Sequence, residues 1–472
     1  MAFVSFMWQH RFLLLLACLC REKAKHMAPF QKVETISPES ARSLAVMRGL
    51  ALALSLAALA MAGFWITRSN TDFEVFLLPW YRAILSEGRL AALHGGFSDY
   101  TPPYIYLLVL CTLADGWLNP IVAVKLCSLL WTLFGATQVH GICRAVGRSR
   151  EFSLLAAVIF ATLPELSLNS IVWGQSDAVY VSFLLAFLHA LLRGRRGWAM
   201  VMFGIALAFK PLAAVVAPFV AYLLLRDLPV PGRAARALRD AMLVPLTYAT
   251  MMLPAVLAGR PLRELFTFYA NQYGEHPLLS MAAPNPWLIV QQLVAYPVDF
   301  REPPLLSRLA PDAFLWLQGV LPQHDGMILA GVVVALLACG ALLLSFLTCR
   351  SQPEPAQLVT MLALAALLVP YFAPRMHERY FIAAGVLTYV LALIRPGLWP
   401  AALCMQAAAV LSYTRFLFDI PKLPMLGMLF STTALLLLLR HYLRDRREMA
   451  AAAPASLERL GHDRRGPQAL TS

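Results

Sequence analysis

The sequence predicts an all-α protein, a polytopic bundle of about 10–13 membrane helices, on three observations. Hydrophobic residues make up 60% of the 472 residues and charged residues only 14%. The mean hydropathy is +0.65. The apolar runs are longer than the alternating segments of roughly ten residues that build membrane β-barrels. This composition excludes a soluble globular domain.

The expected membrane segments are apolar stretches that approach the roughly 20 residues needed to cross a bilayer. They are 46–66, 121–142, 152–168, 173–193, 239–258, 327–347, 357–373, 380–394, 397–416 and 424–443. Residues 103–118 are short, so we expect them to dip into the membrane without crossing. Residues 198–226 are too long for one helix and are interrupted at Lys210-Pro211, which predicts a hairpin.

The basic residues indicate the orientation of the bundle. The net charge of +13 is concentrated in short loops between apolar runs, which is typical of cytoplasmic loops and not of a nucleic-acid surface. We therefore expect no nucleic-acid partner. Loops 144–150, 194–197 and 226–239 should be cytoplasmic, and loops 67–100 and 259–325 extracytoplasmic.

The ends of the chain are interpreted as tails. Residues 1–45 are expected to form a cytoplasmic tail, and residues 446–472 a second one. The apolar run Phe12 to Cys20 resembles a signal-peptide core without a convincing cleavage site, and Met27 or Met47 could be the true start. The eight cysteines have no metal-ligand spacing, so neither a metal site nor a cofactor is predicted.

Both long outer loops are expected to be folded at the membrane surface. Residues 73–93 have apolar positions at helical spacing, which predicts an interfacial amphipathic helix. These positions are Phe73, Phe76, Leu77, Trp80 and Ile84. Residues 259–326 should form a lid with short helices at 262–273, 286–296 and 305–320.

Asp72 is the candidate catalytic residue. It follows the first apolar run at the start of the amphipathic helix, where a carboxylate could act as a general base towards an incoming hydroxyl. Its alternative role is that of an N-cap, which satisfies free helix amides. Glu74 is a weaker candidate for substrate binding, because the same periodicity places it on the solvated side.

Two further polar segments lie on the same predicted side. Trp173, Gln175 and Asp177 begin a membrane helix, and capping explains the aspartate but not its neighbours. Tyr100, Pro103 and Tyr104 fit a substrate loop as well as they fit a helix start with an aromatic anchor.

Lys210 and the segment Arg375–Arg379 supply the candidate cations. An intramembrane lysine is a functional hypothesis by default, with snorkelling as its alternative. Arg375 and Arg379 are four residues apart, so a helical turn would place both on one face to grip a phosphate. His377 and Glu378 could contact a sugar, or could join the arginines in a structural salt-bridge cluster.

These motifs, in this order, resemble the GT-C superfamily of integral-membrane glycosyltransferases over residues 46–445. The resemblance rests on the outer-loop Asp72, on Trp173-Gly174-Gln175-Ser176-Asp177, on Lys210-Pro211 and on Met376-His377-Glu378-Arg379-Tyr380. The family's Tyr-Pro-Pro motif is interrupted here by Thr101.

The resemblance implies transfer of a single sugar, a hexose such as mannose, from a polyprenyl-phosphate donor to a glycan or lipid acceptor. It implies inversion, no metal ion, and a site facing the periplasm in a bacterial inner membrane. Asp72 would be the base, and Asp177 with Arg375–Arg379 would serve the donor. The alternatives are a membrane transporter or lipid-linked sugar flippase, and an inactive structural subunit.

Overall fold

The computed structural model describes residues 38–230, 232–265, 278–295, 305–320, 324–349 and 352–463. The chain divides into two compact units, Met1–Val46 and Met47–Ser472. Residues 38–46 are helical and begin α2 (Pro38–Trp65).

The described part of the chain is almost entirely helical, as predicted. Up to residue 257 the elements after α2 are η1 (Phe73–Leu77), α3 (Leu78–Glu87), η2 (Ala91–His94), α4 (Pro102–Thr112), α5 (Pro120–Ala145), α6 (Arg150–Ala161), α7 (Pro164–Ser167), η3 (Leu168–Trp173), α8 (Asp177–Leu192), α9 (Arg196–Phe209), η4 (Pro211–Val216), α10 (Ala217–Leu225) and α11 (Ala234–Leu257).

The second half follows the same pattern with one small sheet. Its elements are β1 (Ser280–Met281), α13 (Pro286–Val290), η5 (Gln291–Ala295), α14 (Leu305–Leu309), α15 (Pro311–Val320), α16 (His324–Leu347), α17 (Pro355–Phe372), β2 (Met376–His377), η6 (Glu378–Phe381), α18 (Ile382–Ile394), η7 (Pro396–Leu398), α19 (Trp399–Phe418) and α20 (Leu423–Asp463). The two strands pair in parallel, Ser280 with Met376 and Met281 with His377.

Seven of the described helices are long and apolar enough to cross a membrane, and an eighth candidate is a bent pair. Four shorter apolar helices accompany them, at Pro102–Thr112, Asp177–Leu192, Arg196–Phe209 and Pro211–Leu225. The all-α membrane bundle is therefore confirmed at this level. How many helices cross stays a prediction.

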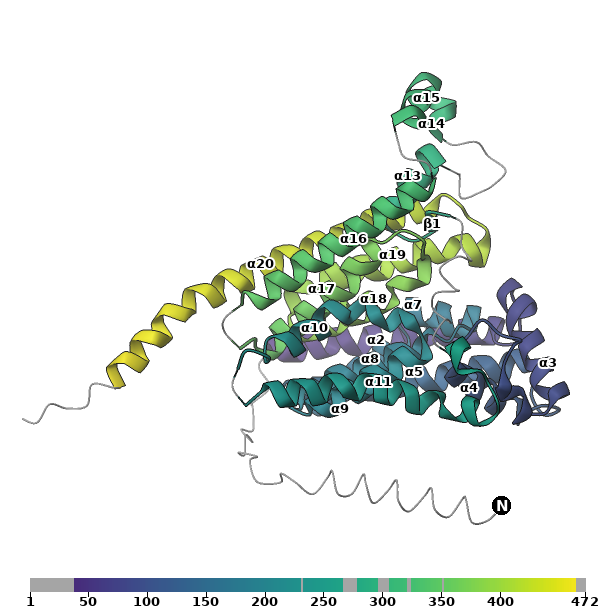
Figure 1. Cartoon of the computed structure of the whole chain (residues 1–472), viewed down its shortest axis with the longest axis horizontal. Helices are drawn as coiled ribbons and strands as arrows, with labels where there is room; N and C mark the ends of the chain where they lie inside the picture. The colour runs from purple at the N-terminus through teal and green to yellow at the C-terminus, as the bar shows by residue number, and fades with distance from the viewer. Residues whose placement is uncertain are drawn as a thin grey trace, which may run out of the picture. The chain divides into compact units, whose positions relative to one another are not determined.

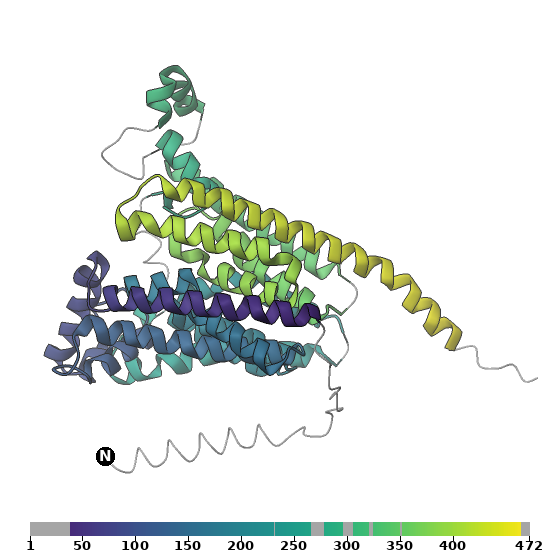
Figure 2. The same ribbon diagram turned by 180° about the vertical axis from the view of Figure 1, so that it is seen from behind.

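Within the unit from Met47 on, packed helix pairs surround a buried centre. Helix α8 packs against α5 and α9, α17 against α18, and α19 against α20. Helices α8 and α18 are buried along nearly their whole length. Helix α2, purple in Figure 2, instead exposes Leu52, Leu56 and Leu59, each by more than half. Apolar side chains exposed on one helix face suit contact with lipid.

The predicted hairpin at 198–226 is confirmed, whereas the expectation that 103–118 dips into the membrane without crossing stays a prediction. The ends of 198–226 come together, because the Arg196 guanidinium contacts the Asp227 carboxylate and donates to the Leu223 carbonyl at 2.6 Å. That stretch is a hairpin broken at Lys210. Helix α4, for its part, has 11 residues and a length of about 16 Å, roughly half the hydrocarbon thickness.

Two details of the prediction are wrong. The segment 152–168 is not one straight helix, because α6 ends at Ala161 and the chain bends by 44° into Pro164–Trp173. Pro164 has no backbone N–H to continue α6 and starts α7 instead. In the amphipathic segment, Phe76 is 43% exposed, so its expected place on the apolar face is wrong. Tyr81 is buried there instead, at helical spacing from Phe73, Leu77 and Ile84.

The long loop 259–326 is helical where it is described. Helices α14 and α15 occupy the predicted patch 305–320, and α13 with η5 occupy the predicted patch 286–296 as far as residue 295, where the described residues end. Residues 262–265 are helical, and the rest of the patch 262–273 lies outside the described residues.

Candidate active site

The side chain of Asp72 is the meeting point of the three polar clusters. Its Oδ2 accepts hydrogen bonds from Trp173 Nε1 and from Gln175 Nε2, each at 2.9 Å. Arg379 Nη1 lies 3.7 Å from the same oxygen. Oδ1 accepts no hydrogen bond from the described part of the chain, and the side chain is 35% exposed. One oxygen is therefore held in place while the other is available.

Asp72 does not cap the helix that follows it. It precedes η1 with helical backbone angles and makes no capping hydrogen bond. Asn70 does so instead, because its Oδ1 accepts from the Phe73 amide at 3.1 Å. Asn70 Nδ2 also donates to the Trp173 carbonyl at 2.7 Å. The N-cap interpretation of Asp72 is therefore wrong, and its role as a general base stays a prediction.

Gly174 allows the chain to turn so that Trp173 and Gln175 both reach Asp72. Its φ is +79°, in the left-handed region that disfavours side chains. A Cβ there would also lie 3.3 Å from the Lys125 side chain. The Gln175 amide then donates to the Asn169 carbonyl at 2.9 Å, and the Gln175 carbonyl accepts from Ser128 at 2.8 Å. The turn is therefore fixed through both backbone groups of Gln175.

Asp177 and Lys210 form a buried ion pair below this turn. Lys210 Nζ contacts Asp177 Oδ1, and Asn169 Nδ2 donates to Asp177 Oδ2 at 3.0 Å. The Asp177 side chain is fully buried and that of Lys210 is 12% exposed. Lys210 therefore does not snorkel to an interface. A buried pair of this kind needs both partners, since either charge alone would be uncompensated.

Arg379 contacts both the base candidate and its tryptophan donor. Its Cζ lies 5.6 Å from the centre of the Trp173 ring, in a cation–π arrangement. The ring is supported from behind by Tyr413 and Phe416 of α19. The buried Nε of Arg379 has no hydrogen-bond partner within the described residues. The guanidinium therefore has a donor to offer to an anion.

The prediction that Arg375 and Arg379 share one helical face is wrong. Residues 376–377 are extended in β2, and η6 begins only at Glu378. Arg375 has a φ of +60° and its amide donates to the Leu279 carbonyl at 2.8 Å. Pairing with β1 keeps this segment extended, so helical spacing does not apply to it. Of the two arginines, Arg379 is the one that contacts Asp72.

His377 and Glu378 contact each other beside this group. His377 Nδ1 lies 3.1 Å from Glu378 Oε2, and the His377 ring packs near Tyr380 and Phe416. Glu378 is fully buried. In the salt-bridge alternative Glu378 would pair with the arginines, whereas the ion pair of Arg379 is with Asp72.

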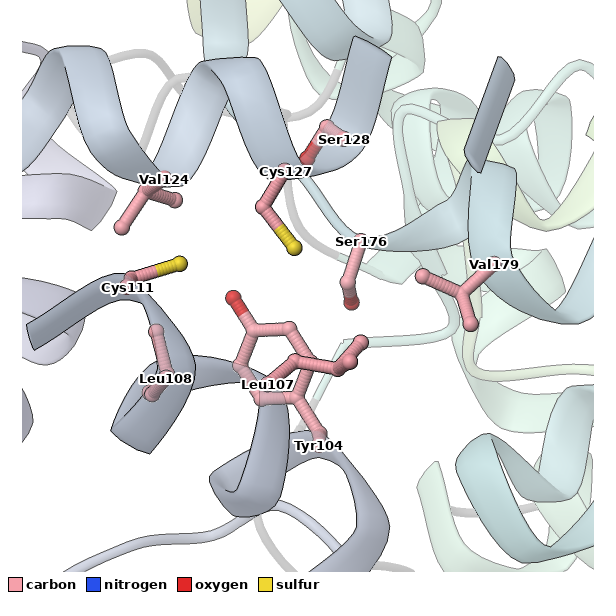
Figure 3. A pocket seen from close by; sticks show the side chains of 9 residues that line it. All are labelled: Tyr104, Leu107, Leu108, Cys111, Val124, Cys127, Ser128, Ser176 and Val179. Carbon is pink, nitrogen blue, oxygen red and sulfur yellow. The ribbon is translucent and has the colours of Figure 1, made fainter. Parts of the chain in front are cut away.

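In the Tyr100 segment, Tyr100 lies at the site, whereas Tyr104 lies in the protein core. Tyr100 Oη donates to Gln175 Oε1 at 3.4 Å, and Lys210 Nζ lies 5.8 Å from the centre of the Tyr100 ring. Pro102 and Pro103 begin α4, as a helix start requires. Tyr104 is buried, and Figure 3 shows its hydroxyl turned towards Cys111 and Cys127. That pocket, of about 10 Å³, is at the lower limit for one water and cannot hold a sugar.

Glu74 is exposed on η1 and faces solvent, as its periodicity predicted. Among the described residues, no hydrogen bond or ion pair joins Glu74, Pro103 or Tyr104 to Asp72, Trp173, Gln175 or Arg379, which together are called the Asp72 group.

Sequence reasoning missed Lys125, a buried lysine of α5. Its Nζ donates to the carbonyls of Trp65 and Arg68, each at 2.7 Å. A cation is favourable at a helix C-terminus because the last carbonyls have no partner within the helix. Lys125 thus fixes the end of α2 just before Asp72. The rule that drew attention to Lys210, a lysine within an apolar run, would have identified it.

Glu165 is a second missed residue. It is fully buried on α7 and exchanges two hydrogen bonds with Gln406, whose amide donates to Oε2 at 3.0 Å and whose oxygen accepts from the Glu165 amide at 3.2 Å. These bonds join α7, which precedes η3 in the chain, to α19, whose Tyr413 and Phe416 contact the Trp173 ring. The signal was a glutamate inside an apolar stretch.

The arrangement combines an exposed carboxylate oxygen with a guanidinium that has a spare N–H. The carboxylate can accept a proton from a hydroxyl, and the guanidinium can bind an anionic group beside it. Among the described residues, no group of three or more His, Cys, Asp or Glu side chains is placed to hold a metal ion. No protein-family model matches the chain, and no curated protein matches it.

Proposed function

We propose that this chain is an inverting glycosyltransferase that moves a single hexose from a polyprenyl-phosphate donor to a hydroxyl of a glycan or lipid acceptor. The observation that carries this proposal is the geometry of Asp72. Oδ2 is held by Trp173 and Gln175, and Oδ1 is available at a partly exposed surface. A base must be both oriented and reachable to take a proton from a substrate.

Asp72 takes the proton of the acceptor hydroxyl through Oδ1. The acceptor oxygen forms a bond to the anomeric carbon as the bond from that carbon to the phosphate oxygen breaks. Attack and departure on opposite faces of the carbon give inversion. The two N–H donors on Oδ2 keep the carboxylate from rotating out of reach, and their bonds are formed before substrate arrives.

Arg379 takes the donor phosphate. In the free protein its nearest carboxylate is Asp72, at 3.7 Å. A phosphate that enters beside Arg379 competes for the guanidinium, so the carboxylate is released to accept a proton. Charge builds on the leaving phosphate during bond breaking, where a guanidinium with an unpartnered Nε can stabilise it.

We also propose on which side of the membrane the site lies. The orientation expected from the basic loops puts the Asp72 group on the periplasmic side of a bacterial inner membrane. A lipid-linked donor presents its phosphate at a membrane surface, so a cation beside a partly exposed base suits such a donor.

A transporter or lipid-linked sugar flippase is the alternative, favoured by the buried Asp177–Lys210 pair at a helix break. Thr101 Oγ1 donates to the Phe209 carbonyl next to this break at 2.9 Å. The break is thus tied to the start of α4, close to the Asp72 group. A transport pathway would have its charges midway across the bundle, so this position favours sugar transfer.

The test uses the full chain reconstituted in lipid, with radiolabelled polyprenyl-phosphate hexoses and a glycolipid extract as acceptor. We expect labelled acceptor and free polyprenyl phosphate to appear in equal amounts. The same donors in sealed vesicles measure translocation. Movement of intact donor across the bilayer without breakage of its sugar–phosphate bond would favour the flippase and contradict this proposal.

A further inference from the structure

A larger cavity, of about 630 Å³, lies between α5, α8 and α9. Helix α8 packs directly against both α5 and α9. Three arginines line it (Arg144, Arg193 and Arg195), as do three large apolar side chains (Phe134, Phe183 and Met202). His189 also lines it and is twelve residues beyond Asp177 on α8, which is about 18 Å along the helix. This end of the cavity is therefore distant from the Asp72 group.

The three arginines that line this cavity can bind an anion. Within the part of the chain that the structure describes, no carboxylate pairs with Arg144, Arg193 or Arg195. The adjacent Arg196 differs, because it contacts Asp227 and lies 3.1 Å from Asp240. Arg193 and Arg195 flank Gly194, whose φ of +69° permits the tight turn between α8 and α9. The turn places both arginines at one edge of the cavity.

The deeper wall is apolar and buried. Phe183 lies ten residues, about 15 Å, before Arg193 on α8, and its ring packs against Phe134 at 5.6 Å. Ala186 and Ala190 are buried on the same side of α8 and leave room between the rings and the arginines. Trp198 is 44% exposed beside the arginines, as suits a tryptophan at the level of lipid head groups. The cavity thus changes from cationic to apolar along its length.

We propose that this cavity binds an anionic glycerophospholipid of the leaflet that borders the basic loops. Its phosphate contacts Arg193 and Arg195, and one acyl chain lies along Ala190 towards Phe183. Basic pockets between membrane helices suit anionic head groups, and the negatively charged leaflet of a bilayer lies on the side of the basic loops. The distance to Asp72 excludes delivery of this phosphate to the proposed transfer site, so the lipid is not the sugar donor.

The test is native mass spectrometry of the delipidated full chain titrated with defined lipids. We expect dioleoylphosphatidylglycerol to bind at least about tenfold more tightly than dioleoylphosphatidylcholine. The double variant Arg193→Gln/Arg195→Gln should lose at least about tenfold in affinity for phosphatidylglycerol, because it removes the two charges that contact the phosphate. The variant Arg193→Lys/Arg195→Lys keeps the charge and should retain most of the binding. Arg150→Gln, an exposed arginine at the start of α6, is the matched control and should bind as the unaltered chain does.

Two further variants separate the outcomes. Ala190→Leu narrows the cavity without changing its charge and should weaken phosphatidylglycerol binding. Asp72→Asn should bind the lipid normally, so this experiment tests lipid binding independently of sugar transfer. Equal affinity for both phospholipids, or undiminished binding by the double glutamine variant, would overturn the proposal. So would displacement of phosphatidylglycerol by equimolar farnesyl phosphate, which would assign the cavity to isoprenoid phosphates.

Discussion

Trp173 Nε1 donates a hydrogen bond of 2.9 Å to Asp72 Oδ2, across 101 positions of sequence. This bond joins the end of η3 to the residue that opens η1. Arg379 lies near both residues, with its guanidinium beside the Asp72 carboxylate and the Trp173 ring. The tryptophan therefore orients the carboxylate through its N–H and supports the guanidinium through its ring.

Arg379→Lys should abolish most donor use while the fold remains intact. Lysine keeps the charge but loses the planar fork that grips a phosphate and stacks on Trp173. The measurement pairs binding of a polyprenyl-phosphate hexose with thermal melting of the same purified variant. Arg375→Lys is the comparison and should have a smaller effect, because Arg375 lies in the extended segment before β2. Normal donor binding in a destabilised Arg379→Lys protein would assign this arginine to structure alone.

Asp177→Asn should destabilise the protein because it leaves Lys210 buried without a counter-charge. Breaking a buried pair costs about 3–5 kcal/mol. The double variant Asp177→Asn/Lys210→Met removes both charges and should melt closer to the unaltered protein than the single variant does. Thermal unfolding in detergent measures both. If the two substitutions lowered the melting temperature additively, the pair would not be coupled.

Lys125→Met should lower stability by about 2–3 kcal/mol, because two carbonyls at the end of α2 lose a charged donor. Sugar transfer should also fall, since Asp72 follows this helix end closely. Thr137→Ala, at an exposed position on the same helix, is the control and should leave both properties unchanged. A Lys125→Met protein with unchanged melting and turnover would show that the cap does not position Asp72.

The orientation can be tested with single cysteines in a background without the eight native ones. Leu90→Cys, at a position that is 75% exposed, should react with an impermeant maleimide added outside intact cells. Arg236→Cys, at an exposed position in the first turn of α11, should react only after permeabilisation. Labelling of position 236 from outside would reverse the orientation and move the Asp72 group to the cytoplasm.

The sequence was sufficient to predict those site residues that can be recognised from their immediate neighbours in the chain. Asp72, Asp177 and Lys210 each interrupt or end an apolar run, where an ionisable group needs a partner, and all three have one. The break at Lys210-Pro211 followed from the same reasoning. Helical periodicity also identified Phe73, Leu77, Trp80 and Ile84 as buried positions, and they are.

Features that depend on distant residues could not be predicted in this way. Arg375 and Arg379 do not share a face because β2 pairs with β1, whose residues 280 and 281 are almost a hundred positions earlier. Apolar spacing placed Phe76 on the buried face of its segment, where Tyr81 lies instead, and it did not reveal that η1 is π-helical. The sequence alone could not identify Asn70, and not Asp72, as the capping residue, because this depends on the contact of the distant Trp173 and Gln175 with the Asp72 side chain.

Asp72→Asn tests the central claim most directly. The amide keeps the size of the carboxylate but cannot accept the proton, so sugar transfer from a polyprenyl-phosphate hexose should fall at least about 100-fold. Glu74→Gln, a matched change at an exposed carboxylate on the same helix, should leave transfer unchanged. Both variants should melt as the unaltered protein does. Loss of transfer in a folded Asp72→Asn protein is the predicted result, and near-normal turnover in that variant would contradict the account.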